Sequence, residues 1–147
     1  MEAAEAALRS SGAAVEEVRP PGGGHAITLD VWRSYGGGDE RRRAYGVLRR
    51  WDAFRTEMLA FGERYDLILS PVFARPAPLH GDVSRPGEVD PTSFTTPHSL
   101  TGWPSATVRA GASAAGLPID VQLAARPWRD DVALAAALAV ERLDAAG

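Results

Sequence analysis

His98 and Ser99 are adjacent residues whose side chains could serve as a base and a nucleophile. In such a pair the histidine removes the hydroxyl proton and the serine oxygen attacks a carbonyl carbon. Neighbouring residues seldom bring their side chains together productively, and the sequence defines neither an orienting acid nor oxyanion donors around them. We therefore assign no catalytic residue to this chain.

The three histidines, His25, His80 and His98, are also candidates for metal ligands. They lie far apart in the sequence, and the chain has no cysteine. Metal sites that can be recognised from sequence usually have closely spaced ligands. We therefore predict no metal site and no cofactor, and a loop or surface position for each histidine. Convergence of the histidines in the fold is the open alternative.

Two short strands are expected to form the centre of the fold, at Ser105–Arg109 and Ile119–Ala124. The link between them contains Gly111 and Gly116, which suit a turn because glycine adopts positive φ without a steric cost. In the second run, the apolar residues Ile119, Val121 and Leu123 occupy every second position. The positions between and after them are Asp120, Gln122 and Ala124. The alternation predicts one apolar face that can be buried.

The clearest helix is predicted to begin at Asp39. Seven apolar or aromatic residues follow at steps of three or four: Tyr45, Leu48, Trp51, Phe54, Met58, Phe61 and Tyr65. This spacing places them along one stripe of a helix. Most arginines of the segment, including Arg41–Arg43, fall off the stripe and should form a solvated face. An aromatic stripe could also line a ligand pocket, but we favour core packing.

The N-terminal region predicts two shorter elements. Met1–Ser11 is Ala-rich and predicts a short helix, with Leu8 as its one large apolar residue. Ala14–Val18 predicts a strand, which the following prolines and glycines end. In Ile27–Tyr35 the apolar residues are too few to decide between a helical turn and an irregular segment.

The remaining elements lie on either side of a long connection. Tyr65–Ser70 predicts a buried strand that ends before a proline, and Phe73–Ser93 is long for a connection in a compact domain. Asp130 and the residues after it predict a closing helix, since acidic residues suit a helix N-terminus. We expect its apolar face to cover the sheet, with Leu134 and Leu138 one turn apart and Val140 and Leu143 widening it.

Composition limits the classes of function. The chain has 147 residues, 45% of them hydrophobic and 24% charged, which is ordinary for a globular domain. A net charge of −3 gives no basic surface for nucleic acid, and no apolar run is long enough to span a bilayer. We therefore expect no nucleic-acid partner, no membrane association and a cytoplasmic location.

Several separated motifs carry a resemblance to a known family. Leu100–Pro104 reads Leu-Thr-Gly-Trp-Pro, Gly111 follows, and Gly116–Leu123 reads Gly-Leu-Pro-Ile-Asp-Val-Gln-Leu. In type and order these resemble the C-terminal signature of the amidase signature family of amide hydrolases. The resemblance implies an α/β fold class, with a partial mixed β-sheet flanked by three helices. It also implies that residues 1–147 form a single partial amidase-like domain, the C-terminal segment of that fold.

The family's chemistry, as the resemblance implies it, uses a serine nucleophile, a second serine in a cis peptide bond and a lysine base. All sixteen basic residues here are arginine, and neither Gly22–Gly24 nor Gly36–Gly38 has a serine between its glycines. The resemblance implies a substrate-pocket role for Thr92, Phe94 and Trp103. Relatives that handle glutamine often have an aspartate at the position of Thr92, so we favour a general amidase over a glutamine amidotransferase subunit.

Two functions remain open. The first is the C-terminal segment of an amidase that hydrolyses amide C–N bonds of a small-molecule substrate only together with a complementary N-terminal chain. The second is a non-catalytic binding or structural module that associates with a partner chain. Two departures from the family pattern, Arg109 and Asp120, are expected to form a compensating ion pair, with solvent exposure of Asp120 as the alternative.

Overall fold

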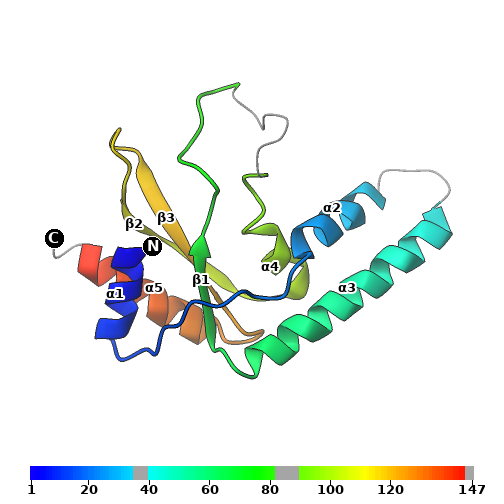
Figure 1. Ribbon diagram of the computed structural model, residues 1–147, viewed down its shortest axis with the longest axis horizontal. Helices are drawn as coiled ribbons and strands as arrows, with labels where there is room; N and C mark the ends of the chain where they lie inside the picture. The colour runs from blue at the N-terminus through cyan, green and yellow to red at the C-terminus, as the bar shows by residue number, and fades with distance from the viewer. Residues whose placement is uncertain (35–39, 82–89, 145–147) are drawn as a thin grey trace.

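The computed structural model describes residues 1–34, 40–81 and 90–144. Helices and strands follow in the order α1 (Glu2–Ser10), α2 (Gly24–Ser34), α3 (Glu40–Gly62), β1 (Leu67–Pro71), α4 (Thr96–Thr101), β2 (Ser105–Ala112), β3 (Pro118–Ala125) and α5 (Asp130–Asp144). Figure 1 shows the sheet between two groups of helices, with α1 and α5 on one side and α2, α3 and α4 on the other.

The three described strands form an antiparallel sheet in the order β1-β3-β2. In the register, Leu123 of β3 lies between Leu69 of β1 and Ala106 of β2. Both central strands that the sequence predicted are present, and Gly116, with a φ of 79°, lies in the turn between them. The α/β fold class is confirmed.

The core has one cluster on each face of β3. On the first face, Val121 and Leu123 pack with Leu8 of α1 and Val140 of α5. On the second face, a cluster of buried residues joins β3 to α3 and to the segment before β2: Phe54, Met58, Trp103 and Ala124. Val121 and Leu123 of the predicted apolar face are therefore buried, whereas Ile119 at the start of the strand is 40% exposed. On the opposite face, Gln122 and Ala124 are buried and Asp120 is exposed.

The aromatic stripe of α3 is only partly buried. Phe54 and Met58 lie in the core, but 67% of Tyr45 and 43% of Leu48 are exposed. The expectation that the whole stripe packs was therefore wrong, because the first half of α3 extends beyond the sheet and lies beside α2 (Figure 1). The predicted start at Asp39 and the side chains of Arg41–Arg43 lie outside the described residues.

The closing helix α5 contacts β2 and β3, as expected. Val140 of the predicted face is buried, but Leu134 and Leu138 are 64% and 44% exposed. The prediction was wrong for these two leucines, because Ala133 is buried and Ala136 and Ala137 pack against the core cluster in their place.

Two further corrections concern the N-terminal half and α4. Ala14–Val18 is not a strand: the carbonyl of Val15 accepts a hydrogen bond from the guanidinium of Arg9 at 2.6 Å, and the segment pairs with no described strand. The undecided segment Ile27–Tyr35 is helical through Ser34 as part of α2. The sequence did not predict α4, so the structure has five helices among the described residues where three were expected.

Candidate functional site

A pocket of about 830 Å³ opens where α3, α4, the start of β2 and the end of β3 meet. Its walls are formed by Arg55, Leu59, Thr95, His98, Ser99, Thr101, Gly102, Trp103, Pro104, Ser105, Gln122, Pro127, Trp128 and Asp130. The pocket combines aromatic and proline surfaces with hydroxyl and amide groups. Apolar surface with a small number of polar groups is typical of small-molecule sites.

Of the three residues for which the resemblance implies a pocket role, Trp103 lines this pocket and is buried against Phe54 and Met58. Thr92 and Phe94 are not among the lining residues and lie in the turn before α4. The carbonyl of Thr92 accepts a hydrogen bond from the Thr95 hydroxyl, which does line the pocket. Thr92 and Phe94 thus lie outside the pocket lining, and Thr92 contacts the lining residue Thr95.

His98 is buried and uncharged at neutral pH. Burial lowers its pKa from 6.5 to about 4. Among the described residues, His98 Nδ1 and Trp103 Nε1 are enclosed without a hydrogen-bond partner, and the two rings lie 6.4 Å apart between centroids. Ser99, by contrast, is exposed, and its hydroxyl donates to the Thr95 carbonyl. The structure therefore does not join His98 and Ser99 as base and nucleophile.

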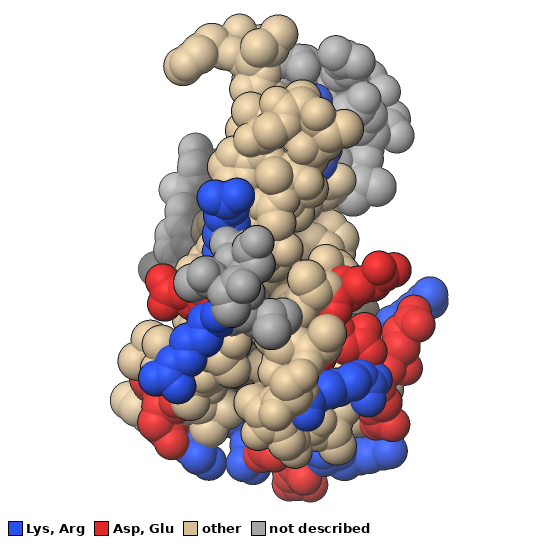
Figure 2. All heavy atoms as spheres, turned by 90° about the vertical axis from the view of Figure 1, so that its left-hand side faces the viewer, with Lys and Arg blue, Asp and Glu red and all other residues tan. Residues whose placement is uncertain are grey.

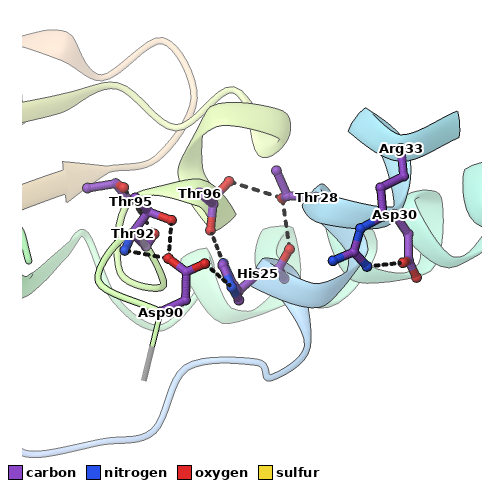
Figure 3. A network of polar contacts seen from close by, with 9 residues as sticks. His25, Thr28, Asp30, Arg33, Asp90, Thr92, Thr95 and Thr96 are labelled. Atoms are coloured by element: carbon purple, nitrogen blue, oxygen red, sulfur yellow. Dashed lines mark hydrogen bonds and ion pairs between the residues drawn. The ribbon is translucent and has the colours of Figure 1, made fainter. Parts of the chain in front are cut away.

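A second polar group connects α2 to the turn before α4 (Figure 3). His25 Nδ1 lies 2.8 Å from the Thr96 hydroxyl, and His25 Nε2 lies 3.6 Å from Asp90 Oδ2. Asp90 Oδ1 accepts hydrogen bonds from the hydroxyl and the backbone N–H of Thr92. These two bonds lower the pKa of Asp90. Because Thr96 is buried, we interpret this network as support for the turn.

Gln122 links the sheet to the same turn. Its Nε2 donates to the carbonyl of Phe94 at 3.2 Å and to the Ser70 hydroxyl at 3.3 Å. A carbonyl can only accept, so the contact with Phe94 fixes which end of the amide is nitrogen. Sequence reasoning placed Gln122 on the polar face of its strand but gave it no role. The only sequence signal for such a role was one side-chain amide, Gln122, between two apolar residues of the strand.

No group of three or more histidine, aspartate or glutamate residues able to hold a metal ion occurs in the described ranges. The same part of the chain contains no helix that is both long and apolar enough to cross a membrane.

Comparison with known proteins gives consistent results. The family model described as Amidase matches residues 33–134. The fatty acid amide hydrolase of Medicago truncatula is 35% identical over 55% of this chain and 14% of its own length. The acylamidase of Rhodococcus erythropolis is 36% identical over 65% of this chain and 23% of its own length. One chain of the glutamyl-tRNA(Gln) amidotransferase from Geobacter metallireducens is 41% identical over 56% of this chain and 18% of its own length.

Solved structures show the same fold. A substrate complex of 6-aminohexanoate cyclic dimer hydrolase aligns with 97% of this chain and 40% of its own, with a TM-score of 0.76 and 20% identity. A bacterial aryl acylamidase of the amidase signature family aligns with 95% of this chain and 38% of its own, with a TM-score of 0.66 and 22% identity. This chain matches less than a quarter of the length of each of the three curated relatives named above, the fatty acid amide hydrolase, the acylamidase and the amidotransferase chain. The family match covers most of this chain, which therefore belongs to the amidase signature family.

Proposed function

We propose that this chain forms the pocket-bearing C-terminal part of an enzyme that hydrolyses amide C–N bonds. The observation that carries the proposal is the position of the pocket. Its lining residues, from Arg55 to Asp130, all lie within the segment that matches the family model. The names of the relatives, a fatty acid amide hydrolase and an acylamidase, support an amide as the substrate class.

The proposal includes catalytic dependence on a complementary N-terminal segment. The 147 residues contain no lysine, whereas the chemistry that the resemblance implies needs a lysine base and two serines. We therefore propose that this chain alone is inactive and contributes core sheet and pocket wall to the complete enzyme. Residues 1–147 would then be one partial domain. The pocket roles of Thr92, Phe94 and Trp103 and the cytoplasmic location stay predictions.

The surface supports association with such a segment. β1 and β2 are the outer strands of the described sheet, and outer strands offer backbone groups for pairing. Leu134 and Leu138 of α5 are exposed one turn apart. On the side shown in Figure 2, charged side chains gather on the lower half, while the upper half is largely uncharged. Segment 110–118, the end of β2, the turn and the first residue of β3, contains no charged residue.

A chimera tests the proposal. In the Rhodococcus erythropolis acylamidase, the matched segment is replaced by the aligned residues of this chain. Hydrolysis of 4-nitroacetanilide is followed by release of nitroaniline. Activity is expected from the chimera and not from this chain alone. Replacing the lysine base of the acylamidase portion by alanine is the matched control, because it removes the chemistry without changing this chain.

The second candidate function is a non-catalytic module that binds a partner chain. The exposed leucines of α5 favour association, but they do not distinguish an enzyme segment from a binding partner. The DNA upstream separates the two: an in-frame continuation that encodes a lysine and a Gly-Ser-rich loop favours the enzyme. A folded chimera without turnover would instead favour the module.

A further inference from the structure

The pocket offers hydrogen-bond acceptors more than donors. Four hydroxyls line the pocket, each with one proton, and the protons of three of them are directed at backbone carbonyls. Ser105, the fourth, keeps its proton for donation. Thr95 donates to Thr92, Ser99 to Thr95, and Thr101 to Pro97 or His98. Only oxygen lone pairs of these three hydroxyls remain for a ligand.

Gln122 contributes the most enclosed of these acceptors. Its side chain lines the pocket although only 4% of the residue is exposed. Both N–H groups of its amide are directed at the Phe94 carbonyl and the Ser70 hydroxyl. Oε1 has no partner among the described residues, and it is not one of the enclosed atoms either. Gln122, a residue of the pocket wall, thus keeps an unpaired acceptor oxygen with some exposed surface.

The donors near the pocket are less accessible or lie at its rim. The indole N–H of Trp103 is enclosed. Arg55 is exposed, and its guanidinium lies 5.5 Å from the centre of the Trp51 ring. Of the carboxylates, Asp130 lines the pocket and is exposed. Gln122 is thus a buried, neutral acceptor, whereas the two charged lining residues, Arg55 and Asp130, are exposed.

This arrangement favours a neutral N–H donor over a cation. An ammonium group beside Gln122 would lose its hydration without a buried counter-charge, which is costly. A primary amide carries two N–H donors and no charge. The aromatic and aliphatic surfaces of Trp103, Leu59 and Trp128 provide space for an apolar substituent on the same molecule.

We propose that Gln122 is a ligand-binding residue whose Oε1 accepts a hydrogen bond from the N–H of a neutral amide with an apolar or aryl substituent. This inference rests on the proposed function and adds the group that recognises the substrate. The hydrogen bonds to Phe94 and Ser70 hold the amide of Gln122 in place, so its oxygen is oriented before the ligand binds.

Binding to the full 147-residue chain tests the inference, with three probes of similar size: benzamide, N,N-dimethylbenzamide and benzylamine. Dissociation constants are measured by calorimetry at pH 7, where benzylamine is an ammonium ion. Benzamide is expected to bind about fivefold or more tightly than the dimethyl compound, as one hydrogen bond provides. It should also bind more tightly than benzylamine. Equal affinities for the two amides, or tightest binding of benzylamine, would overturn the proposal.

Gln122→Met keeps the side-chain length and removes the acceptor. Benzamide and N,N-dimethylbenzamide should therefore bind this variant with about equal dissociation constants. Asp120→Gly is the matched control on the same strand, because Asp120 is exposed and does not line the pocket. Ser70→Ala removes one contact of Gln122 but leaves Oε1, so it should retain the preference. A preference that persists in Gln122→Met contradicts the assignment.

A measurement on the unaltered chain covers the case in which Gln122→Met does not fold. The Gln122 side-chain amide resonances should shift on titration with benzamide and remain in place with the dimethyl compound. Absence of this difference counts against the inference. Because this chain has no lysine, binding and turnover are tested separately: an active chimera without amide-selective binding would remove this inference and leave the proposed function intact.

Discussion

Arg109 of β2 and Asp120 of β3 lie directly opposite each other across the antiparallel ladder. Both side chains are exposed, and Arg109 Nε donates to the carbonyl of Gly111 at 3.3 Å, next to an irregularity in the register. The carboxylate of Asp120 is therefore hydrated. The burial that would have required a compensating cation does not occur, so solvent exposure, the alternative weighed for Asp120, describes its position.

A double-mutant cycle measures what remains of this pairing. Asp120→Ala, Arg109→Ala and the double variant are compared by urea unfolding. We expect a coupling free energy below about 1 kcal/mol, since exposed ion pairs contribute little and are screened by salt. A coupling of about 2 kcal/mol or more would contradict the interpretation.

Phe54 is the aromatic residue of the α3 stripe that lies in the core, so its replacement should have a large effect on stability. Phe54→Ala should lower the free energy of unfolding by about 3 to 5 kcal/mol, because the residue is buried and a cavity would remain. Arg49→Ala, an exposed residue of the same helix, should change it by less than about 0.5 kcal/mol. Urea unfolding measures both, and equal midpoints would show that α3 does not pack as described.

Gly24 at the start of α2 lies against Phe54 and Pro97. A Cβ at this position would lie 2.7 Å from Phe54 Cε1 and 2.9 Å from Pro97 Cβ. Gly24→Ala should therefore destabilise the chain by about 1 to 3 kcal/mol. Gly46→Ala is the matched control in α3, where nothing lies within 4 Å, and it should be neutral or stabilising by up to about 1 kcal/mol. Thermal unfolding in which both variants match the parent would contradict this packing.

The buried imidazole of His98 predicts a pH dependence of stability. Its folded pKa is about 4 and the ordinary value is 6.5, so the unfolded chain binds the extra proton between these values. Stability contributed by neutral His98 is therefore complete above pH 6.5 and is lost as the pH falls toward 4. The slope is about 1 kcal/mol per pH unit. Urea unfolding between neutral pH and the folded pKa should show this slope in the parent and a shallower one in His98→Gln. Equal slopes would contradict the burial of a neutral ring.

Trp128, at the pocket rim, has an unusual backbone for its type. Its φ is 67° and 93% of the residue is exposed. A bulky residue pays a steric penalty in this left-handed region, and glycine does not. Trp128→Gly should therefore leave stability unchanged or raise it by about 1 kcal/mol. A marked loss of stability in urea would show that the indole packs in solution.

Local patterns were enough to predict much of the fold. The alternation in β3, the glycines of its turn, the compact run of β1 and the acidic start of α5 each act within a few residues, and all four elements are present. Patterns that depend on distant partners were less informative. Leu134 and Leu138 of α5 were expected to face the sheet, but Val140 and alanines form that contact, and the sequence of the helix alone does not choose between these faces.

The candidate site was less predictable than the fold. Trp103 lines the described pocket, and its role in substrate binding stays a prediction. The network of His25, Asp90 and Thr96 joins α2 to residues far along the chain, and a sequence does not show which of them meet. One local signal was missed: an aspartate that accepts from the residue two positions on is a common turn motif, and Asp90 does so with Thr92.

The rate of 4-nitroacetanilide hydrolysis tests the central claim most directly, measured for this chain alone, for the acylamidase chimera and for the chimera without the lysine base. We predict no turnover above buffer for this chain alone. The chimera should exceed its lysine variant by about a hundredfold or more, which is within the contribution of a general base. Turnover by this chain alone that His98→Ala or Ser99→Ala abolishes would contradict the account, and so would a folded chimera no faster than its lysine variant.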